Sequence, residues 1–324
     1  QVEDMEVFQK CHLALVKVQV SSGVLYSVDF HTTGQHRTLL IVSGDEGILG
    51  FDWNAILEGN TTTLFRCKPH YSLSTVEIND FSIANNFIFG AAGDANGYKW
   101  DLETSKLIAM YPSAKRGYLH SIECLQHDST VLLGGEDGVL GIWDGHHDKL
   151  IENMHLQSIL YKDAHVVEKD SSVSSSITSF LDPSKSSIWI SSIHSPSDNW
   201  WTVCGGILHS ETTSAAHHGA AGGHILSFHA PTRSLVAGCL TRETLQYSCS
   251  STPGTLVTVA NEGVVSHWTP SSLQRRGRVW CSPPSCFAAA IGGTDNVLAV
   301  GGVGNQVDIF NNVAGNKSYS LEIK

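Results

Sequence analysis

The sequence is poor in charged residues, in basic residues and in long apolar runs. Charged residues make up 16% of its 324 residues, and 20 Lys and Arg face 31 Asp and Glu, for a formal net charge of −11. A protein that binds nucleic acid by neutralising phosphates carries a basic face. No apolar run approaches the roughly 18 residues of a membrane span. We therefore expect neither direct RNA binding nor a membrane segment.

Paired cysteines are missing as well. None of the eight cysteines forms a Cys-x-x-Cys pair. Several lie inside apolar strand patterns, where a free cysteine packs as a small hydrophobic residue. The chain also opens without a charged segment followed by an apolar one. We expect reduced cysteines and an intracellular location.

The usual catalytic and metal-binding motifs do not occur. There is no Gly-x-Ser-x-Gly and no His-Glu-x-x-His, and the glycines at 301–304 fall on a hairpin turn rather than before a helix. Zinc sites need fixed spacings on a rigid frame, which these histidines in a Gly- and Ala-rich segment do not offer: His209, His217, His218 and His224. We expect no enzyme activity, no cofactor and no metal, with a propeller hydrolase as the alternative.

What the chain does have is a hairpin that repeats. Val131–Asp144 (VLLGGEDGVLGIWD) predicts an apolar strand, a tight turn at Asp137-Gly138 and a second strand that ends in Trp-Asp. Asp-Gly between apolar runs is a strong hairpin signal because such turns need positive φ. One face of this hairpin is apolar and must be buried against something else.

The rest of the chain supplies copies of the hairpin. The copies are Leu39–Trp53, Phe87–Asp101, Leu256–Trp268 and Val297–Phe310, with a stretched one over Trp200–Phe228. Their closing aromatic residues are separated by 47, 43, 85, 40 and 42 residues. A step of about 40–45 residues is typical of propeller blades with a Trp-Asp signature. The sequence therefore predicts an all-β, WD-repeat β-propeller with six clear blades, as a single domain over residues 1–324.

The repeated positions are predicted to have structural roles. Aromatic rings at the same position of successive blades are expected to pack between blades rather than to bind a ligand, and aspartates in turns shape the turn. The structural positions are Trp53, Trp100, Trp143, Asp144, Trp268 and Phe310.

Two segments interrupt the repeat and one precedes it. The Ser-rich segment 163–185 and the Gly/Ala/His-rich segment 205–223 are predicted to be flexible surface insertions. Only about half a blade precedes the first clear inner strand, Val24–Phe30, so either the ring has six blades or part of a further blade is absent. Leu13–Val20 and Tyr319–Ile323 are possible partners in closing the ring.

Protein-binding residues are predicted from loop position and residue type. Arginine and exposed aromatic residues anchor protein interfaces, and six residues meet that description: Arg116, Tyr118, Trp201, Arg275, Arg276 and Arg278. For the three arginines at 275–278, a solvated loop is the simpler explanation.

Several stretches give the whole chain a resemblance to a particular WD-repeat family, subunit 6 of the THO complex. Glu6–Gln9 resembles the opening of that family, Leu132–Asp144 its central repeat, and Asn199–Gly206 its Asp-Trp-x-Val-Cys-Gly-Gly segment. Gln306–Phe310 followed by Ser318–Leu321 is similar to its C-terminal end. The central repeat is common to WD proteins, whereas the other stretches are more specific and occur in the family's order.

The resemblance implies a function as well as a fold. It implies seven blades and a non-catalytic scaffold in a multi-subunit nuclear complex that couples transcription to mRNA processing and export. It also implies other THO subunits, coiled-coil ones among them, as partners, with indirect RNA contact. The alternative is another WD-repeat adaptor, such as a ubiquitin-ligase substrate receptor or a chromatin scaffold, because a fold alone does not assign a function.

Overall fold

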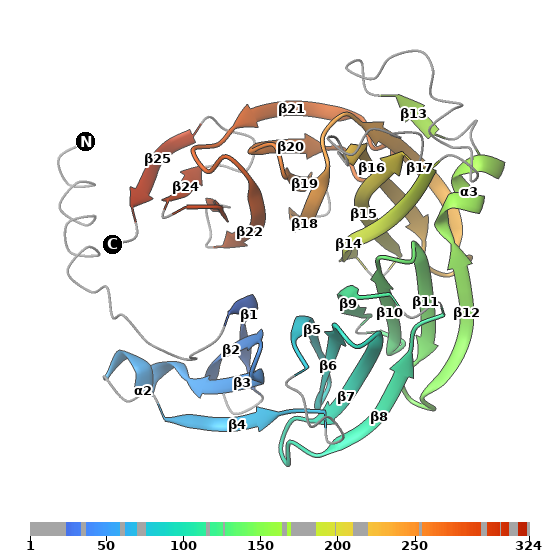
Figure 1. Ribbon diagram of the computed structural model, residues 1–324. Coiled ribbons are helices and arrows are strands. Elements are labelled where there is room, and N and C mark those ends of the chain that lie inside the picture. The colour runs from blue at the N-terminus through green and yellow to red at the C-terminus, as the bar shows by residue number, and fades with distance from the viewer. Residues whose placement is uncertain are drawn as a thin grey trace.

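The described residues form a propeller of six β-sheets, each made of consecutive strands. The computed structural model describes residues 24–33, 37–58, 62–69, 76–114, 117–125, 127–163, 167–169, 186–197, 199–209, 220–252, 255–292, 297–304, 306–310 and 317–322. Figure 1 shows the sheets side by side in chain order around a central channel, with one edge strand of each sheet nearest the channel. The predicted six-bladed, all-β architecture is confirmed for the described part of the chain.

The first three blades are four-stranded antiparallel meanders. Blade one consists of β1 (Leu25–Thr32), β2 (Thr38–Gly44), β3 (Gly47–Asp52) and β4 (Thr63–Cys67), and a short helix, α2 (Trp53–Leu57), connects β3 to β4. Blade two consists of β5 (Ile78–Ala84), β6 (Phe87–Ala92), β7 (Asn96–Asp101) and β8 (Leu107–Pro112). Blade three consists of β9 (Leu119–Cys124), β10 (Thr130–Gly135), β11 (Val139–Asp144) and β12 (Lys149–His155), and α3 (Leu156–Lys162) follows it.

The last three blades complete the series. Blade four contains β14 (Ser186–Ser197), β15 (Trp200–His209), β16 (Ala220–His229) and β17 (Ser234–Thr241), and β13 (Val167–Lys169) joins its outer edge in parallel with β17. Blade five contains β18 (Leu245–Thr252), β19 (Thr255–Ala260), β20 (Val264–Trp268) and β21 (Arg275–Trp280). Blade six contains β22 (Cys286–Gly292), β23 (Val297–Gly302), β24 (Gln306–Phe310) and β25 (Lys317–Glu322).

Strands extend into both segments predicted as insertions. β13 lies within 163–185, and β15 and β16 continue into 205–223 because their pairing runs on past Gly205 and His224. Apart from Asp163, the rest of both segments lies outside the described residues, as do the predicted strand Leu13–Val20 and Arg116. The seventh blade that the family resemblance implied has no counterpart in the residues that the structure describes.

The central hairpin forms as the sequence predicts. Val131 pairs with Trp143 across β10 and β11, and Gly138 adopts a φ of 64° in the turn between them. The Asp137 carboxylate accepts a hydrogen bond from the backbone N–H of Val139 at 3.0 Å, which fixes the turn. A residue with a Cβ at position 138 would be strained at this φ, so the Asp-Gly dipeptide determines the register.

The core consists of apolar clusters between neighbouring blades. One cluster joins blade one to blade two and contains Ile48, Ile88 and Trp100. Four more clusters join blades two and three, three and four, four and five, and five and six. At these five junctions each blade therefore buries an apolar face of its neighbour, which is how the hairpin repeat becomes stable.

The closing aromatic residues lie in these clusters, with one exception. Trp100, Trp143, Trp268 and Phe310 each end or nearly end the third strand of a blade and are at most 7% exposed. Trp53 differs: Phe51, opposite Leu40, occupies the matching position, and Trp53 is the first residue of α2. The Asp52 carboxylate accepts hydrogen bonds from the backbone N–H groups of Asn54 and Ala55, so a helix cap replaces the end of the strand.

Candidate docking surfaces

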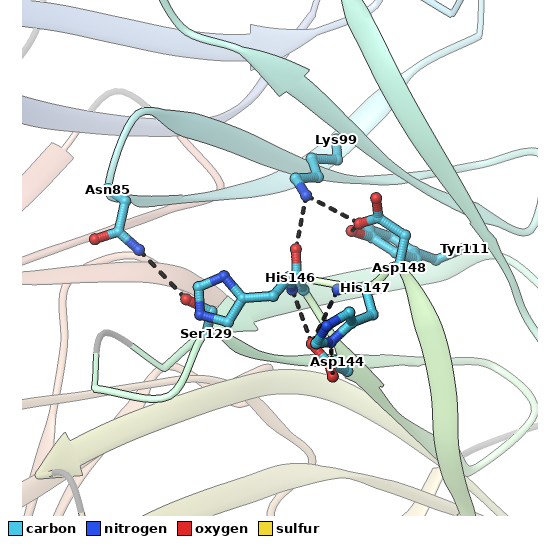
Figure 2. A network of polar contacts seen from close by, with 9 residues as sticks. Asn85, Lys99, Tyr111, Ser129, Asp144, His146, His147 and Asp148 are labelled. Carbon is cyan, nitrogen blue, oxygen red and sulfur yellow. Dashed lines mark hydrogen bonds and ion pairs between the residues drawn. The ribbon is translucent and has the colours of Figure 1, made fainter.

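One group of polar contacts joins blade two to blade three. The ammonium group of Lys99, whose side chain is 4% exposed, donates to the Gly145 carbonyl at 2.6 Å and to the Asp148 carboxylate at 2.9 Å. The hydroxyl of Tyr111 donates to the same carboxylate at 2.6 Å, as Figure 2 shows. Because the buried charge is paired and hydrogen-bonded, this network is a structural clamp rather than a reactive site.

Asp144 shapes the turn that leads to this clamp. Its carboxylate accepts hydrogen bonds from the backbone N–H groups of His146 and His147 and contacts the imidazole Nδ1 of His147 at 2.7 Å (Figure 2). These hydrogen bonds lower the pKa of Asp144 to about 2. The aspartate of the Trp-Asp pair therefore has the turn-forming role that its position predicts.

Two carboxylates lie on the inner strands that line the channel. Asp80 of β5 accepts hydrogen bonds from the hydroxyls of Ser27 and Ser121, on the inner strands to either side of it. Burial raises its pKa to about 6. Burial and the nearby Asp80 charge raise the pKa of Glu123, on β9, to about 8. Both groups resist ionisation, and their hydrogen bonds connect neighbouring blades.

A polar cavity lies at one mouth of the channel. Its volume is about 470 Å³, and five blades supply its lining, which is Tyr26, Glu77, Asn79, Tyr118, His120, Glu136, Trp189, Ser191 and Gln246. Tyr26 and Tyr118 are 46% and 47% exposed. The predicted interface residue Tyr118 therefore lies on an accessible surface beside other aromatic rings and carboxylates.

A second surface lies between blade six and blade one, where the described residues place no sheet against an apolar face of blade one. The apolar cluster of Val42, Leu49, Phe51 and Ile56 contains residues of blade one alone. A pocket of about 720 Å³ lies between this cluster and blade six, where Val28, Leu40, Phe287 and Val307 line it. The pocket also extends along the inner strands and shares part of its lining with the mouth cavity: Tyr26, Asn79, His120, Ser191 and Gln246. Each inner strand packs against the inner strand of the next blade, in the order β1, β5, β9, β14, β18 and β22. Among the described residues, β22 does not pack against β1 to the same extent. Figure 1 shows the ring open at this place.

Trp201 is not a surface residue, and the prediction that it binds a partner is wrong. It is 1% exposed and packs in the cluster between blades three and four, with its ring 5.1 Å from that of Phe228. The side chains of Trp200 and Trp201 point to opposite faces of the sheet, and the Trp201 side chain is on the face that packs against blade three.

The three predicted arginines lie on the outer strand β21 and not on a loop, so the prediction of a solvated loop is wrong; two of them form internal ion pairs. Arg275 and Arg278 form ion pairs with the buried Glu243 at 3.1 and 2.6 Å. The guanidinium of Arg278 also lies 4.8 Å from the centre of the Trp280 ring, which is 62% exposed. Arg276 is exposed and hydrogen-bonds Thr269 through its Nε at 2.7 Å. The basic cluster is therefore partly neutralised by its own chain.

The sequence alone did not single out most of the cavity residues. Tyr26, Glu77 and Trp189 come from different blades and share no local motif. What these residues share is their position in the repeat, because each lies at or near the start of the inner strand of its blade. An alignment of the blades on their inner strands would have brought them together.

These features define the class of protein as a WD-repeat-type β-propeller with uncovered surfaces. Two solved structures share the fold with a TM-score of 0.66: the Cps50 (Swd1) β-propeller domain of Myceliophteria thermophila at 12% identity, and the RRP9 WD40 repeats at 8% identity. They cover 94% and 95% of this chain, and 88% and 83% of theirs. At such identities the likeness shows the fold alone. No protein-family model matches the chain.

Sequence relatives identify the particular resemblance. The THO complex subunit 6 homolog of Danio rerio is 27% identical over 287 residues, which is 84% of this chain and 75% of that protein. The rat homolog and the Arabidopsis thaliana THO complex subunit 6 are 33% and 29% identical, over 38% and 39% of their lengths. The chain is thus similar to THO complex subunit 6 proteins of animals and a plant, as its motifs predicted.

No helix in the described part of the chain has the length and apolar character that crossing a membrane requires.

Proposed function

We propose that this chain is a non-catalytic docking and assembly subunit of a THO complex. Its place is the nucleus, where the assembly couples transcription to mRNA processing and export through contacts between proteins. The observation that carries this proposal is the similarity to relatives named THO complex subunit 6 over 84% of the chain. The partners are the other THO subunits, with coiled-coil subunits among them.

The structure supports a docking role on physical grounds. A ring of packed sheets is a rigid frame, and the loops and uncovered faces on it are free to contact partners. Two adjoining surfaces fit this description: the channel mouth, and the face of blade one that is turned toward blade six. Both present aromatic side chains, which contribute strongly to protein interfaces.

Indirect rather than direct RNA contact also follows from the charges. The chain has a formal net charge of −11. The basic cluster of β21 is partly neutralised, because Arg275 and Arg278 pair with Glu243. An acidic protein with paired arginines repels phosphates, so RNA would reach the chain through other subunits.

The test is affinity purification of the tagged protein from nuclear extract, with and without RNase. Recovery of the other THO subunits after RNase treatment is the expected result. Loss of those subunits on RNase treatment would show that RNA, rather than protein, holds the chain in the assembly. Recovery of a ubiquitin ligase or a histone-modifying complex instead would support another WD-repeat adaptor and overturn the THO assignment.

A further inference from the structure

The channel mouth brings aromatic rings and carboxylates together. The Glu77 carboxylate and the Tyr118 ring both lie against Gly93: a Cβ placed on this glycine would lie 2.6 Å from Glu77 Oε1 and 2.8 Å from Tyr118 Cε1. Glycine at 93 therefore makes the space in which carboxylate and ring come together. Glu136 joins them, because its carboxylate accepts a hydrogen bond from the Tyr118 N–H at 3.2 Å.

A second aromatic ring at the mouth, that of Tyr26, also lies close to carboxylates. The hydroxyl of Tyr26 donates to the Asp45 carboxylate at 3.2 Å. Burial, this hydrogen bond, and the negative charges of Asp45 and Glu77 all raise the pKa of Tyr26. Burial also lowers the pKa of His120, against the effect of the Glu136 charge, so the imidazole is neutral at pH 7. Among the described residues that line the cavity, none carries a positive charge.

We propose that this mouth binds a positively charged, extended protein segment through its Arg or Lys side chains. A guanidinium or ammonium group is attracted to the faces of tyrosine and tryptophan. It also forms charge-assisted hydrogen bonds with carboxylates. Tyr26, Tyr118 and Trp189 supply the rings, and Glu77 and Glu136 supply the carboxylates. The inference rests on the proposed docking function and names the chemistry of one partner contact.

The size of the cavity favours single side chains over a folded domain, and its charge favours a basic peptide over RNA. A cavity of about 470 Å³ holds one or two side chains and not a folded domain. Single-stranded RNA also stacks its bases on aromatic rings, but it needs a positively charged groove for its backbone. The carboxylates at this mouth repel phosphates and attract Arg or Lys, which favours the peptide.

The test measures binding of a fluorescein-labelled peptide of alternating Arg and Gly to the purified full chain by fluorescence anisotropy. The variants are Glu77→Gln with Glu136→Gln, and Tyr118→Ala. The matched control is Glu58→Gln with Glu103→Gln, which removes the same charge from exposed carboxylates at the opposite end of the blades. We expect roughly tenfold weaker binding for each mouth variant and less than about a twofold change for the control.

Equal weakening by the mouth variant and the control would show a general charge effect and overturn the proposal. Competition by an oligouridine RNA that Tyr118→Ala abolishes would assign the mouth to RNA instead. Thermal unfolding of each variant shows whether it folds, and the double Gln variant preserves side-chain size. Because this experiment needs no other subunit, its failure is separate from a failure of the purification test, which judges membership of the THO complex.

Discussion

The two faces of blade one differ in what covers them. The face toward blade two is buried: Ile48 is fully buried, and its Cδ1 lies within 3.3 Å of the position of a Cβ on Gly90 in blade two. On the face toward blade six, Val28 and Phe30 are 63% and 53% exposed. The same strands therefore carry one face that stabilises the ring and another whose apolar side chains remain accessible.

The difference shows what holds the propeller together. Apolar burial of about 25 cal/mol per Å² is available only where a second sheet is present. Five junctions have that second sheet, and the cluster on the open face of blade one has residues of a single blade. Side chains of the same type should thus contribute differently to stability on the two faces.

The largest predicted effect is a loss of stability at a covered junction. Ile48→Ala should lower the free energy of unfolding by about 2–5 kcal/mol, because it leaves a cavity between blades one and two. Urea denaturation measures this change. The matched substitution Val28→Ala, on the open face, should cost less than about 1 kcal/mol. Equal costs would mean that the open face is covered in solution.

The next effect concerns the polar clamp between blades two and three. Lys99→Met should lower the free energy of unfolding by about 1–3 kcal/mol, because Asp148 and the Gly145 carbonyl lose a buried donor. Lys106→Met, at an exposed lysine of the same blade, serves as the control and should change stability little. A neutral result for Lys99→Met would show that apolar packing alone holds this junction.

A smaller effect depends on pH. The pKa of Glu123 is raised from 4.5 to about 8, so the folded chain keeps a proton that the unfolded chain releases above pH 4.5. Ionisation therefore favours unfolding as pH rises from 4.5 to 8. Glu123→Gln should therefore stabilise the protein more at pH 7.5 than at pH 4.5, because the glutamine has no proton to release. Denaturation curves at both pH values check this, and a pH-independent difference would contradict the raised pKa.

The smallest effect is expected on the open face itself. Val28→Ser should change the free energy of unfolding by less than about 0.5 kcal/mol, since the side chain is 63% exposed. The same variant should reduce binding of the apolar dye ANS, because it makes the exposed stripe more polar. An unchanged ANS signal together with a large loss of stability would contradict the exposure of this strand.

The repeat pattern predicted the fold because the pattern is local. A strand, a turn with positive φ and a closing aromatic residue all lie within one hairpin, as in Val131–Asp144. The hairpin cannot bury its own face, so its repetition implies stacked blades. Trp53 escaped this prediction because the Asp52 side chain starts a helix, which a strand-based repeat does not anticipate.

The surfaces could be predicted only in part, because they depend on distant residues. Alternation along β15 shows that Trp200 and Trp201 face opposite ways, but the packing of blades decides that Trp201 is buried. Arg275 and Arg278 pair with Glu243, which is more than 30 residues away. The channel mouth draws on five blades and has no motif of its own.

Hydrogen exchange of the purified chain, followed by mass spectrometry, tests the central comparison most directly. The account predicts faster exchange in β1 and β22, which border the open junction, than in the inner strands β5, β9, β14 and β18, which are packed on both sides. Equal protection of all the inner strands would show that the junction between blades six and one is closed in solution, and would contradict the account.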